Sequence, residues 1–345
     1  MVQMGNEYQQ HIHVFRGIAI IFIVFAHTVP SLYWSGWPLT GKLIDAVANQ
    51  SSIFFFFIAG YLFQHLSFRF SFPKYLKQKF KTVILPYILL SIPALFVFTV
   101  LTQRTGMWSW FYDLEIWQQV ALFMLTGKHL APLWFVPTIA MFYLIAPLLI
   151  WMDRNTPKVY WLILPLLVLS TYLGRDGSYG PINTAIYLFP VYLMGMAFSH
   201  FKQQAMSLVM RWWPVLLLIA AVAAVGLVLG WSSPPYWHMP MKTSLTLILT
   251  WQLYHHHHIF GHRLDYIAEI SFGIFFIHAY LISAIKVATV YALYGTIYDG
   301  RGAEEIPGNL LTFGIYASIV IFFTVSTIWF ARRVLGKNSR MFIGS

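Results

Sequence analysis

HIHVFRGIAIIFIVFAHT, residues 11–28, is an apolar run long enough to enter a membrane. It carries Arg16 near one end and His27 near the other, eleven residues apart. At about 100° per residue both point from one helix face, about 16 Å apart along the axis. Arg16 alone is typical of a residue that reaches lipid headgroups, and His27 alone of a core histidine. The pair on one face indicates function, because ionisable groups inside a spanning helix are costly.

The composition identifies an integral membrane protein. Of the 345 residues, 59% are hydrophobic and only 10% are charged, and the mean hydropathy is +0.66. We expect one transmembrane domain over residues 1–345. The chain has no cysteine, which excludes disulfides and thiolate metal sites. The N-terminus lacks the basic region and cleavage site of a signal peptide, so we expect the first helix to be retained.

Hydropathy predicts an all-α polytopic bundle of about ten transmembrane helices. Proline and glycine interrupt several of them, so we expect kinks that neighbouring helices satisfy. Residues 103–130 are too polar to span, and residues 117–125 are expected to form a re-entrant or interfacial helix. The approximate extents of the spans are 12–32, 44–66, 82–102, 131–151, 159–174, 182–199, 212–231, 241–258, 266–292 and 309–334.

The distribution of the 22 Lys and Arg residues predicts the orientation. With a cytoplasmic N-terminus, the inside loops hold 14 of them, the outside loops hold six, and Arg16 and Lys286 lie within spans. Both termini are therefore expected in the cytoplasm, with Arg16 near the cytoplasmic surface and His27 in the outer half of the membrane. This bias accounts for much of the net charge of +11 without a nucleic-acid partner.

A lysine-rich segment, PKYLKQKFKTVILPY, covers residues 73–87. Lys74, Lys77 and Lys81 recur at helical spacing, with Lys79 to one side. Such a segment usually meets anionic lipid. It can also form a phosphate-binding patch at the cytoplasmic mouth, suited to a nucleotide-containing donor.

Polar and aromatic residues mark the expected outer ends of two helices. Asn49, Gln50, Ser51 and Ser52 precede the phenylalanine-rich run FFFFIAGYL, whose Ala59-Gly60 pair favours close helix packing. Trp134 and Phe135 begin another helix, where tryptophan is ordinarily a membrane-interface anchor. The polar group either lines a site or simply ends a helix.

Two groups of ionisable residues lie late in the chain. Glu269 is a carboxylate near a cytoplasmic helix end and is a natural partner for Arg16 or a lysine, and His278 lies deeper in the same helix. The histidines at 255–258, with His262 beyond, have metal-ligand spacing if the helix continues. Because no acidic or cysteine ligand completes that set, we expect no metal site and favour a wet helix end.

In order and spacing, these stretches resemble the membrane-bound acyltransferase 3 family. The family's Arg, ten residues, then His matches Arg16 and His27, and its FF-x-x-S-G-Y/F segment matches FFFIAGYL, with Ala59 in place of serine. Its basic segment ending in Pro-Tyr matches KYLKQKFKTVILPY, and its Trp-Phe pair matches residues 134–135. The late Ser-Tyr/Phe-Gly-x-(aromatic)-x-x-His pattern matches SFGIFFIH, which ends at His278.

The resemblance covers about residues 10 to 335, with two departures. The basic segment is all lysine where arginines are usual, and Thr82 stands where one is common; lysine binds phosphate but lacks the bidentate fork of arginine. Ala59 implies that a serine hydroxyl is dispensable there or that the acceptor differs. The extracytoplasmic hydrolase-like domain of some relatives is absent from the sequence.

The resemblance implies transfer of an acyl group, most commonly acetyl, from cytoplasmic acyl-CoA to a hydroxyl of a glycan or lipid-linked saccharide. His27 is then the catalytic residue, either as a general base or as an acyl-imidazole carrier. Arg16 would hold the donor's phosphate or pantetheine end, or orient the thioester. The expected donor-binding lysines are Lys74, Lys77, Lys79 and Lys81, and the expected substrate-binding residues are Asn49, Gln50, Ser52, Trp134, Phe135, Glu269 and His278.

Two other functions fit the same residues. Kinked helices and ionisable residues inside the membrane also suit a transporter or exporter of a polysaccharide intermediate, although no internal repeat supports it. A polysaccharide-assembly partner without activity of its own is the third possibility. The resemblance implies a multi-pass protein of the bacterial inner membrane that works in exopolysaccharide biosynthesis, with acyl-CoA as a co-substrate and no permanently bound cofactor.

Overall fold

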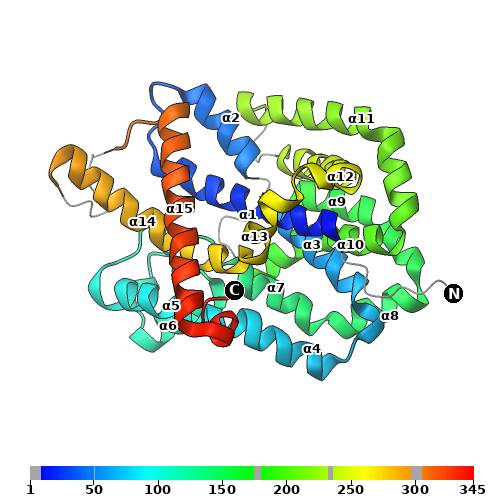
Figure 1. Cartoon of the computed structure of the whole chain (residues 1–345), viewed down its shortest axis with the longest axis horizontal. Coiled ribbons are helices and arrows are strands. Elements are labelled where there is room, and N and C mark those ends of the chain that lie inside the picture. Colours follow the sequence, from blue (N-terminus) through cyan, green and yellow to red (C-terminus); the bar gives the residue numbers. More distant parts are fainter. Residues whose placement is uncertain (1–8, 50, 175–179, 232–235, 297–304) are drawn as a thin grey trace.

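The computed structural model of the chain describes residues 9–49, 51–174, 180–231, 236–296 and 305–345, and every regular element in these ranges is a helix (Figure 1). The predicted all-α bundle is confirmed. The first half contains α1 (Gln10–Thr28), α2 (Pro38–Ala48), α3 (Ser51–His65), α4 (Phe72–Lys79), α5 (Leu85–Phe96), α6 (Ile116–Thr126), α7 (Phe135–Leu144) and α8 (Ala146–Asn155). The second half contains α9 (Ile163–Leu173), α10 (Pro181–His200), α11 (Lys202–Leu229), α12 (His238–His256), α13 (Gly261–Glu269), α14 (Ser271–Tyr294), α15 (Leu310–Leu335) and α16 (Ser339–Phe342).

Seven helical stretches in the described ranges are long and apolar enough to cross a membrane, or eight if α7 and α8 form one span bent by 54°. The predicted count of ten is therefore not confirmed. The segment predicted at 159–174 is a shorter apolar helix, Pro157–Leu173, and the one at 241–258 is α12, which is not among the spans. The seven stretches are Gln10–Ser31, Pro38–His65, Phe72–Leu101, Pro181–His200, Lys202–Leu229, Ser271–Tyr294 and Leu310–Phe342.

Helix α12 is too polar to count as a span, chiefly because of Lys242, Gln252 and its three histidines, and threonines occupy its buried face. The hydroxyls of Thr246 and Thr250 are fully buried and donate to the carbonyls of Lys242 and Thr246, one turn earlier, at 2.6 Å. These bonds satisfy the hydroxyls within the helix itself. Helix α12 is therefore polar in composition and still fits inside the bundle.

Helix α1 lies at the centre of the bundle (Figure 1) and contacts α2, α3, α12, α13, α14 and α15. Its residues Val14, Phe15, Ala19, Ile20 and Val24 are completely buried. An apolar helix surrounded by other helices has this pattern of burial. Arg16 and His27 are thus carried by the helix around which the others pack.

Helices α3 and α10 cross in close contact because each has a glycine at the crossing point. A Cβ atom on Gly60 would lie 2.0 Å from the carbonyl oxygen of Tyr192, and one on Gly195 would lie 2.1 Å from that of Phe57. Only glycine allows the two backbones to approach this closely. The close packing predicted for the Ala59-Gly60 pair is confirmed.

Prolines interrupt the helices at two points. Residues Phe80–Ile84, between α4 and α5, form a π-helical turn just before Pro86, which has no N–H to donate to a carbonyl one turn earlier. The 54° bend between α7 and α8 precedes Pro147, in the first turn of α8. Pro137 lies in the first turn of α7, where proline is tolerated.

The beginning of α1 and the end of α15 lie beside α13, at the same end of the bundle. Gln10 donates to Asp265 at 2.9 Å, and Arg332 donates to Glu269 at 2.6 Å. This arrangement agrees with both termini lying on one side of the membrane. Which side faces the cytoplasm stays a prediction.

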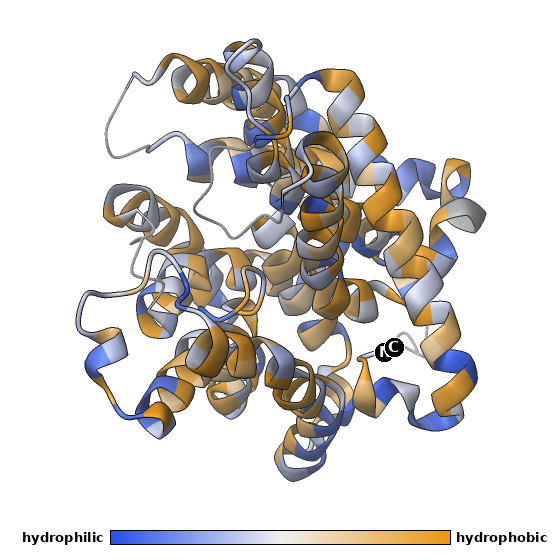
Figure 2. Ribbon diagram, turned by 90° about the vertical axis from the view of Figure 1, so that its left-hand side faces the viewer, coloured by the Kyte–Doolittle hydropathy of each residue, from blue (hydrophilic) through white to orange (hydrophobic). Residues whose placement is uncertain are grey.

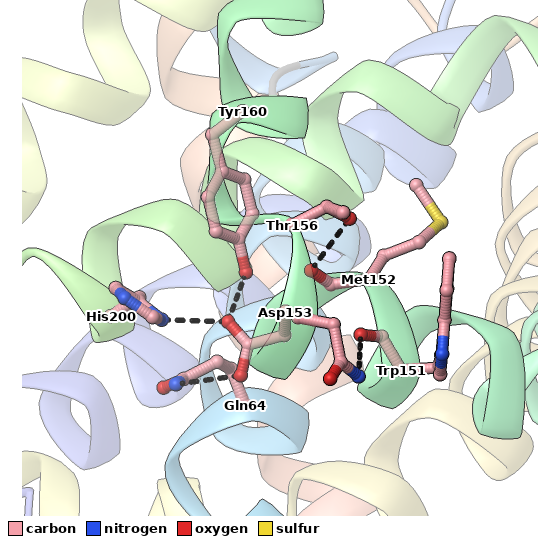
Figure 3. Close-up of polar contacts among 8 residues, drawn as sticks. Gln64, Trp151, Met152, Asp153, Thr156, Tyr160 and His200 are labelled. Carbon is pink, nitrogen blue, oxygen red and sulfur yellow. Dashed lines mark hydrogen bonds and ion pairs between the residues drawn. The ribbon is translucent and has the colours of Figure 1, made fainter.

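A buried carboxylate, Asp153 of α8, joins three further segments (Figure 3). It accepts hydrogen bonds from Gln64 of α3 at 3.2 Å, from Tyr160 at 2.6 Å and from His200 of α10 at 2.7 Å. Three donors satisfy an acid that would be costly to bury alone. This cluster fixes α8 against α3 and α10.

The outer surface of the bundle is strongly apolar. The ribbons of the long helices are largely hydrophobic in Figure 2. Exposed large side chains cover α9, α11 and α15, including Val168, Leu218 and Phe322. An exposed apolar surface of this extent suits contact with lipid.

Candidate active site

A pocket of about 490 Å³ opens between α1, α3, α4, α7, α14 and the residues that follow α15. Its cations come from four separate segments of the chain, and none of the described residues that line it is acidic. Such a pocket attracts anions. We call it the basic pocket, and its positively charged lining residues are Arg16, Arg69, Lys74, Lys79 and Arg340.

The two ends of the basic pocket differ in character. Arg69, Lys74 and Arg340 are exposed, whereas Phe55 and Phe135 on the same lining are buried. A ligand with an anionic head and a slender, less polar tail fits this gradient. Arg16 is half-buried, and its Nη2 lies 3.4 Å from Nδ1 of His13.

The helical period of α4 places some of its lysines on the face that lines the pocket and leaves Lys77 away from it. Lys74 and Lys79 line the pocket, and so do Tyr75 and Gln78, which share that face. Lys79 Nζ lies 5.4 Å from the ring centroid of Tyr75 and 5.2 Å from that of Tyr143, so two aromatic faces hold the ammonium group.

The other two predicted donor lysines, Lys77 and Lys81, are exposed and are not among the described residues that line the pocket. The sequence reasoning did not assign Arg69 or Arg340. Arg69 lies just before α4 and belongs to the same run of basic residues. Arg340 is 324 positions from Arg16, and no local pattern connects the two.

The catalytic candidate His27 lies beside His278 of α14. Their ring centroids are 5.4 Å apart and the ring planes make an angle of 38°. His278 is completely buried, and its Nδ1 lies 2.8 Å from the carbonyl oxygen of Ile274, so Nδ1 carries the hydrogen and donates it. His278 Nε2 makes no hydrogen bond within the described part of the chain. That nitrogen is thus left as an acceptor.

Packed phenylalanine rings lie at the buried end of the basic pocket. The ring of Phe135 packs against those of Phe55, Phe56 and Phe275, with centroid distances of 6.2, 5.1 and 5.4 Å. We call these four residues the ring layer. Phe55 and Phe135 also line the pocket, whereas neither His27 nor His278 is among its described lining residues. Phe275 precedes His278 by three residues on α14, so the ring layer connects the buried end of the pocket to the helix that carries this histidine.

A tight loop places Trp134 and Phe135. Helix α6 ends at Gly127, which has a φ of +69°, and a Cβ there would lie 2.4 Å from the backbone nitrogen of Trp134. Both the backbone conformation and the close approach require glycine. The loop thus turns sharply into α7, so that Phe135 can enter the ring layer.

His129 fixes the same loop and was missed by the sequence reasoning. It is completely buried, with Nδ1 3.0 Å from the carbonyl oxygen of Phe123 and Nε2 2.7 Å from the hydroxyl oxygen of Ser91. Arg104 donates to its carbonyl oxygen at 3.0 Å. Burial is the largest effect on this imidazole and lowers the pKa of His129 to about 4. A neutral imidazole therefore fixes the loop.

The residues predicted on the acceptor side are placed as follows. Asn49 donates to Asp45 at 2.7 Å, Ser52 and Trp134 are half-buried, and Gln50 lies outside the described residues. Phe135 is buried and lines the basic pocket. The substrate-binding role expected for these residues stays a prediction.

Glu269 and the histidines at 255–258 are not among the described residues that line the basic pocket. The side chain of Glu269 is 57% exposed and accepts a hydrogen bond from Arg332 at 2.6 Å. His255, His256 and His258 are exposed, and the side chain of His262 lies outside the described part. Within the described residues, no group of three His, Cys, Asp or Glu side chains is placed to hold a metal ion.

Comparisons with known proteins agree with this arrangement. Residues 10–336 match the acyltransferase domain of the acyltransferase 3 family, which is nearly the whole chain. No curated protein and no solved structure gives a significant match. The match includes α1 with Arg16 and His27, the basic helix α4 and the histidine-bearing helix α14. The chain therefore belongs to the acyltransferase 3 family and is a membrane acyltransferase.

Proposed function

We propose that the protein transfers an acyl group, most commonly acetyl, from cytoplasmic acyl-CoA to a hydroxyl of a cell-surface or lipid-linked saccharide. The basic pocket carries this proposal, because its five cations and its apolar buried end match a donor with a polyphosphate head and a long thioester arm. The family assignment favours acyl transfer over the export of a polysaccharide intermediate.

The donor would bind with its nucleotide at the exposed end of the basic pocket. Lys74 and Lys79 would neutralise its phosphates, and Arg16 would hold the pantetheine end or orient the thioester. His27 lies about 16 Å from Arg16 along α1. The extended arm of acyl-CoA would cover this distance by passing between the side chains of the ring layer.

His27 would then serve in one of two ways. As a general base it removes the proton of the acceptor hydroxyl, whose oxygen attacks the thioester carbonyl. The C–S bond breaks and the CoA thiolate takes the proton from the imidazolium. As a carrier, the imidazole nitrogen attacks the carbonyl, the C–S bond breaks, and the thiolate takes the proton of the other ring nitrogen, so that CoA leaves as the thiol. The acceptor hydroxyl then displaces the imidazole from the acyl group and returns its proton to the ring.

The acceptor would enter from the outer side of the ring layer. His278 Nε2 would accept the hydrogen of a saccharide hydroxyl beside His27. Asn49, Ser52 and Trp134 remain the proposed flanking groups. The proposed setting is the bacterial inner membrane, where polysaccharide-assembly proteins are the expected neighbours.

Purified protein with radiolabelled acetyl-CoA and a saccharide acceptor tests this proposal. We expect His27→Ala to slow CoA release and acceptor labelling by about 10²-fold or more. His255→Ala is the matched control, because His255 is an exposed histidine of the polar run and should leave both rates unchanged. Equal rates in wild type and His27→Ala would overturn the catalytic role of His27.

A further inference from the structure

The residues after α15 turn back and form part of the wall of the basic pocket (Figure 1, red). Gly336 has a φ of +54° and ends α15. The short helix α16 then packs against α5 and the π-helical turn Phe80–Ile84. The chain reverses here because glycine adopts a left-handed conformation that other residues avoid.

Two residues of this segment anchor it in the core. Ile343 is only 7% exposed. Gly344 has a φ of +81°, and a Cβ atom on it would lie 3.0 Å from the ring of Phe276 and 3.4 Å from Cβ of Phe272. Anchoring by a buried isoleucine and a closely packed glycine holds α16 in place. Arg340, on α16, is thereby fixed at the exposed end of the pocket.

Arg340 lies close enough to Lys79 for the two positive charges to repel each other. None of the described lining residues carries a compensating negative charge. Like charges held together by the fold are stabilised when an anion binds between them. The guanidinium group also offers paired donors that match a phosphate geometrically, which the lysines of α4 lack.

Arg340 lies outside the part of the chain that defines the family, since the family match ends at residue 336. The exposure of Arg340 also distinguishes it from the half-buried Lys79 and Arg16. Arg340 is exposed, Lys79 is half-buried, and the apolar end of the pocket lies deeper. A donor that inserts its thioester end first would place its diphosphate near Lys79 and its outermost phosphate near Arg340.

We propose that Arg340 binds the 3′-phosphate of the donor's ribose and thereby makes the pocket selective for CoA over its 3′-dephospho form. This inference rests on the proposed use of acyl-CoA as donor. It assigns a specificity-determining role to a segment beyond the family match, with a phosphate monoester as the ligand group.

Direct binding of CoA and of 3′-dephospho-CoA to the purified full-length protein tests this role without requiring turnover. We expect wild type to bind CoA roughly 10- to 100-fold more tightly than dephospho-CoA. Dephospho-CoA lacks the 3′-phosphate and therefore cannot form the charge-assisted hydrogen bonds to Arg340. Arg340→Ala should lose most of this ratio by weakening CoA binding alone, and Arg340→Lys should retain part of it. Lys337→Ala is the control, because it removes one exposed charge from the same segment without altering the described pocket lining.

The outcomes separate this inference from the proposed function. Equal affinity of wild type for the two ligands, or equal weakening of both by Arg340→Ala, would overturn the role of Arg340 and leave acyl-CoA as the donor. Failure of wild type to bind CoA at all would overturn the proposed donor and the inference with it. The comparison of ligands on wild type holds even if a variant fails to fold.

Discussion

The imidazole ring of His278 lies 5.4 Å from that of His27, although the two residues are 251 positions apart in the chain. The hydrogen bond to the carbonyl oxygen of Ile274 sets the tautomer of His278 and leaves Nε2 as an acceptor. The pair thus combines a half-buried histidine on the central helix with a completely buried one on α14.

Two variants of His278 should separate a chemical role from a packing role. An asparagine amide can occupy the position of Nδ1 and keep the bond to Ile274, but it has no group at the position of Nε2. A glutamine amide reaches the position of Nε2. We expect His278→Asn to lower kcat by about 10²-fold in the acetyl-transfer assay, and His278→Gln to retain more activity. Full activity in a stable His278→Asn protein would show that the residue only packs.

Lys79 and Lys77 offer a matched pair on one helix. Each substitution to alanine removes one positive charge, but only Lys79 lines the basic pocket and faces Tyr75 and Tyr143. We expect Lys79→Ala to raise the KM for acetyl-CoA about tenfold, with little change in kcat. Lys77→Ala should behave as wild type. The same rise in both variants would mean that net charge, and not the pocket, attracts the donor.

The crossing of α3 and α10 should not tolerate a methyl group. We expect Gly60→Ala to reduce the free energy of unfolding by about 2 kcal/mol or more, because the new Cβ would overlap the carbonyl of Tyr192. Gly314→Ala on α15 is the control, since a Cβ there meets no atom within 4 Å. Thermal unfolding in detergent compares the two, and similar Tm values for both variants would contradict the packing argument.

The free energy of unfolding should depend on pH because His129 is buried in the loop before α7. The unfolded imidazole binds a proton near pH 6.5, whereas the folded one does so only near pH 4. The unfolded chain therefore binds more protons between these values, and stability falls as the pH drops through that window, by about 3 kcal/mol when complete. Above pH 6.5 His129 is neutral in both states and the penalty is absent.

Comparing Tm at pH 7.5 and pH 5.0 checks the role of His129. His129→Gln cannot titrate and should lose less Tm on acidification than wild type. His256→Gln removes an exposed histidine and should lose as much as wild type. An unchanged acid response in His129→Gln would show that other groups dominate it.

The sequence predicted the features that depend on composition and local spacing. The apolar runs form helices, and the Ala59-Gly60 pair lies where α3 and α10 cross in close contact. Pro86 and Pro147 lie at the π-helical turn before α5 and at the bend between α7 and α8. Helix α12 shows the limit of hydropathy, because a helix with buried threonines can lie inside the bundle without being apolar. Counting apolar stretches does not reveal whether a helix faces lipid or protein.

Contacts between distant segments could not be predicted from the sequence. Nothing in the local pattern around Arg340 relates it to Lys79, because that proximity depends on how α15 ends and where α16 packs. Phe135 was expected on the acceptor side, and no local pattern predicted that its ring would pack against Phe275 and line the basic pocket. The helical period predicted a common face for Lys74, Lys77 and Lys81 with Lys79 to one side, whereas Lys74 and Lys79 are the lysines of this segment that line the pocket.

The ring layer has a consequence for the ion gradients across the membrane. A protein that accepts a substrate on one side and delivers a group on the other risks becoming a leak for protons and cations. Phe55, Phe56, Phe135 and Phe275 offer such ions no hydration and no counter-charge, so their packed rings act as an electrical insulator. In the proposed reaction a thin neutral acyl-pantetheine arm would part these rings, which would close behind it. In the proposed reaction the chain would then pass acyl groups outward while the membrane potential is preserved.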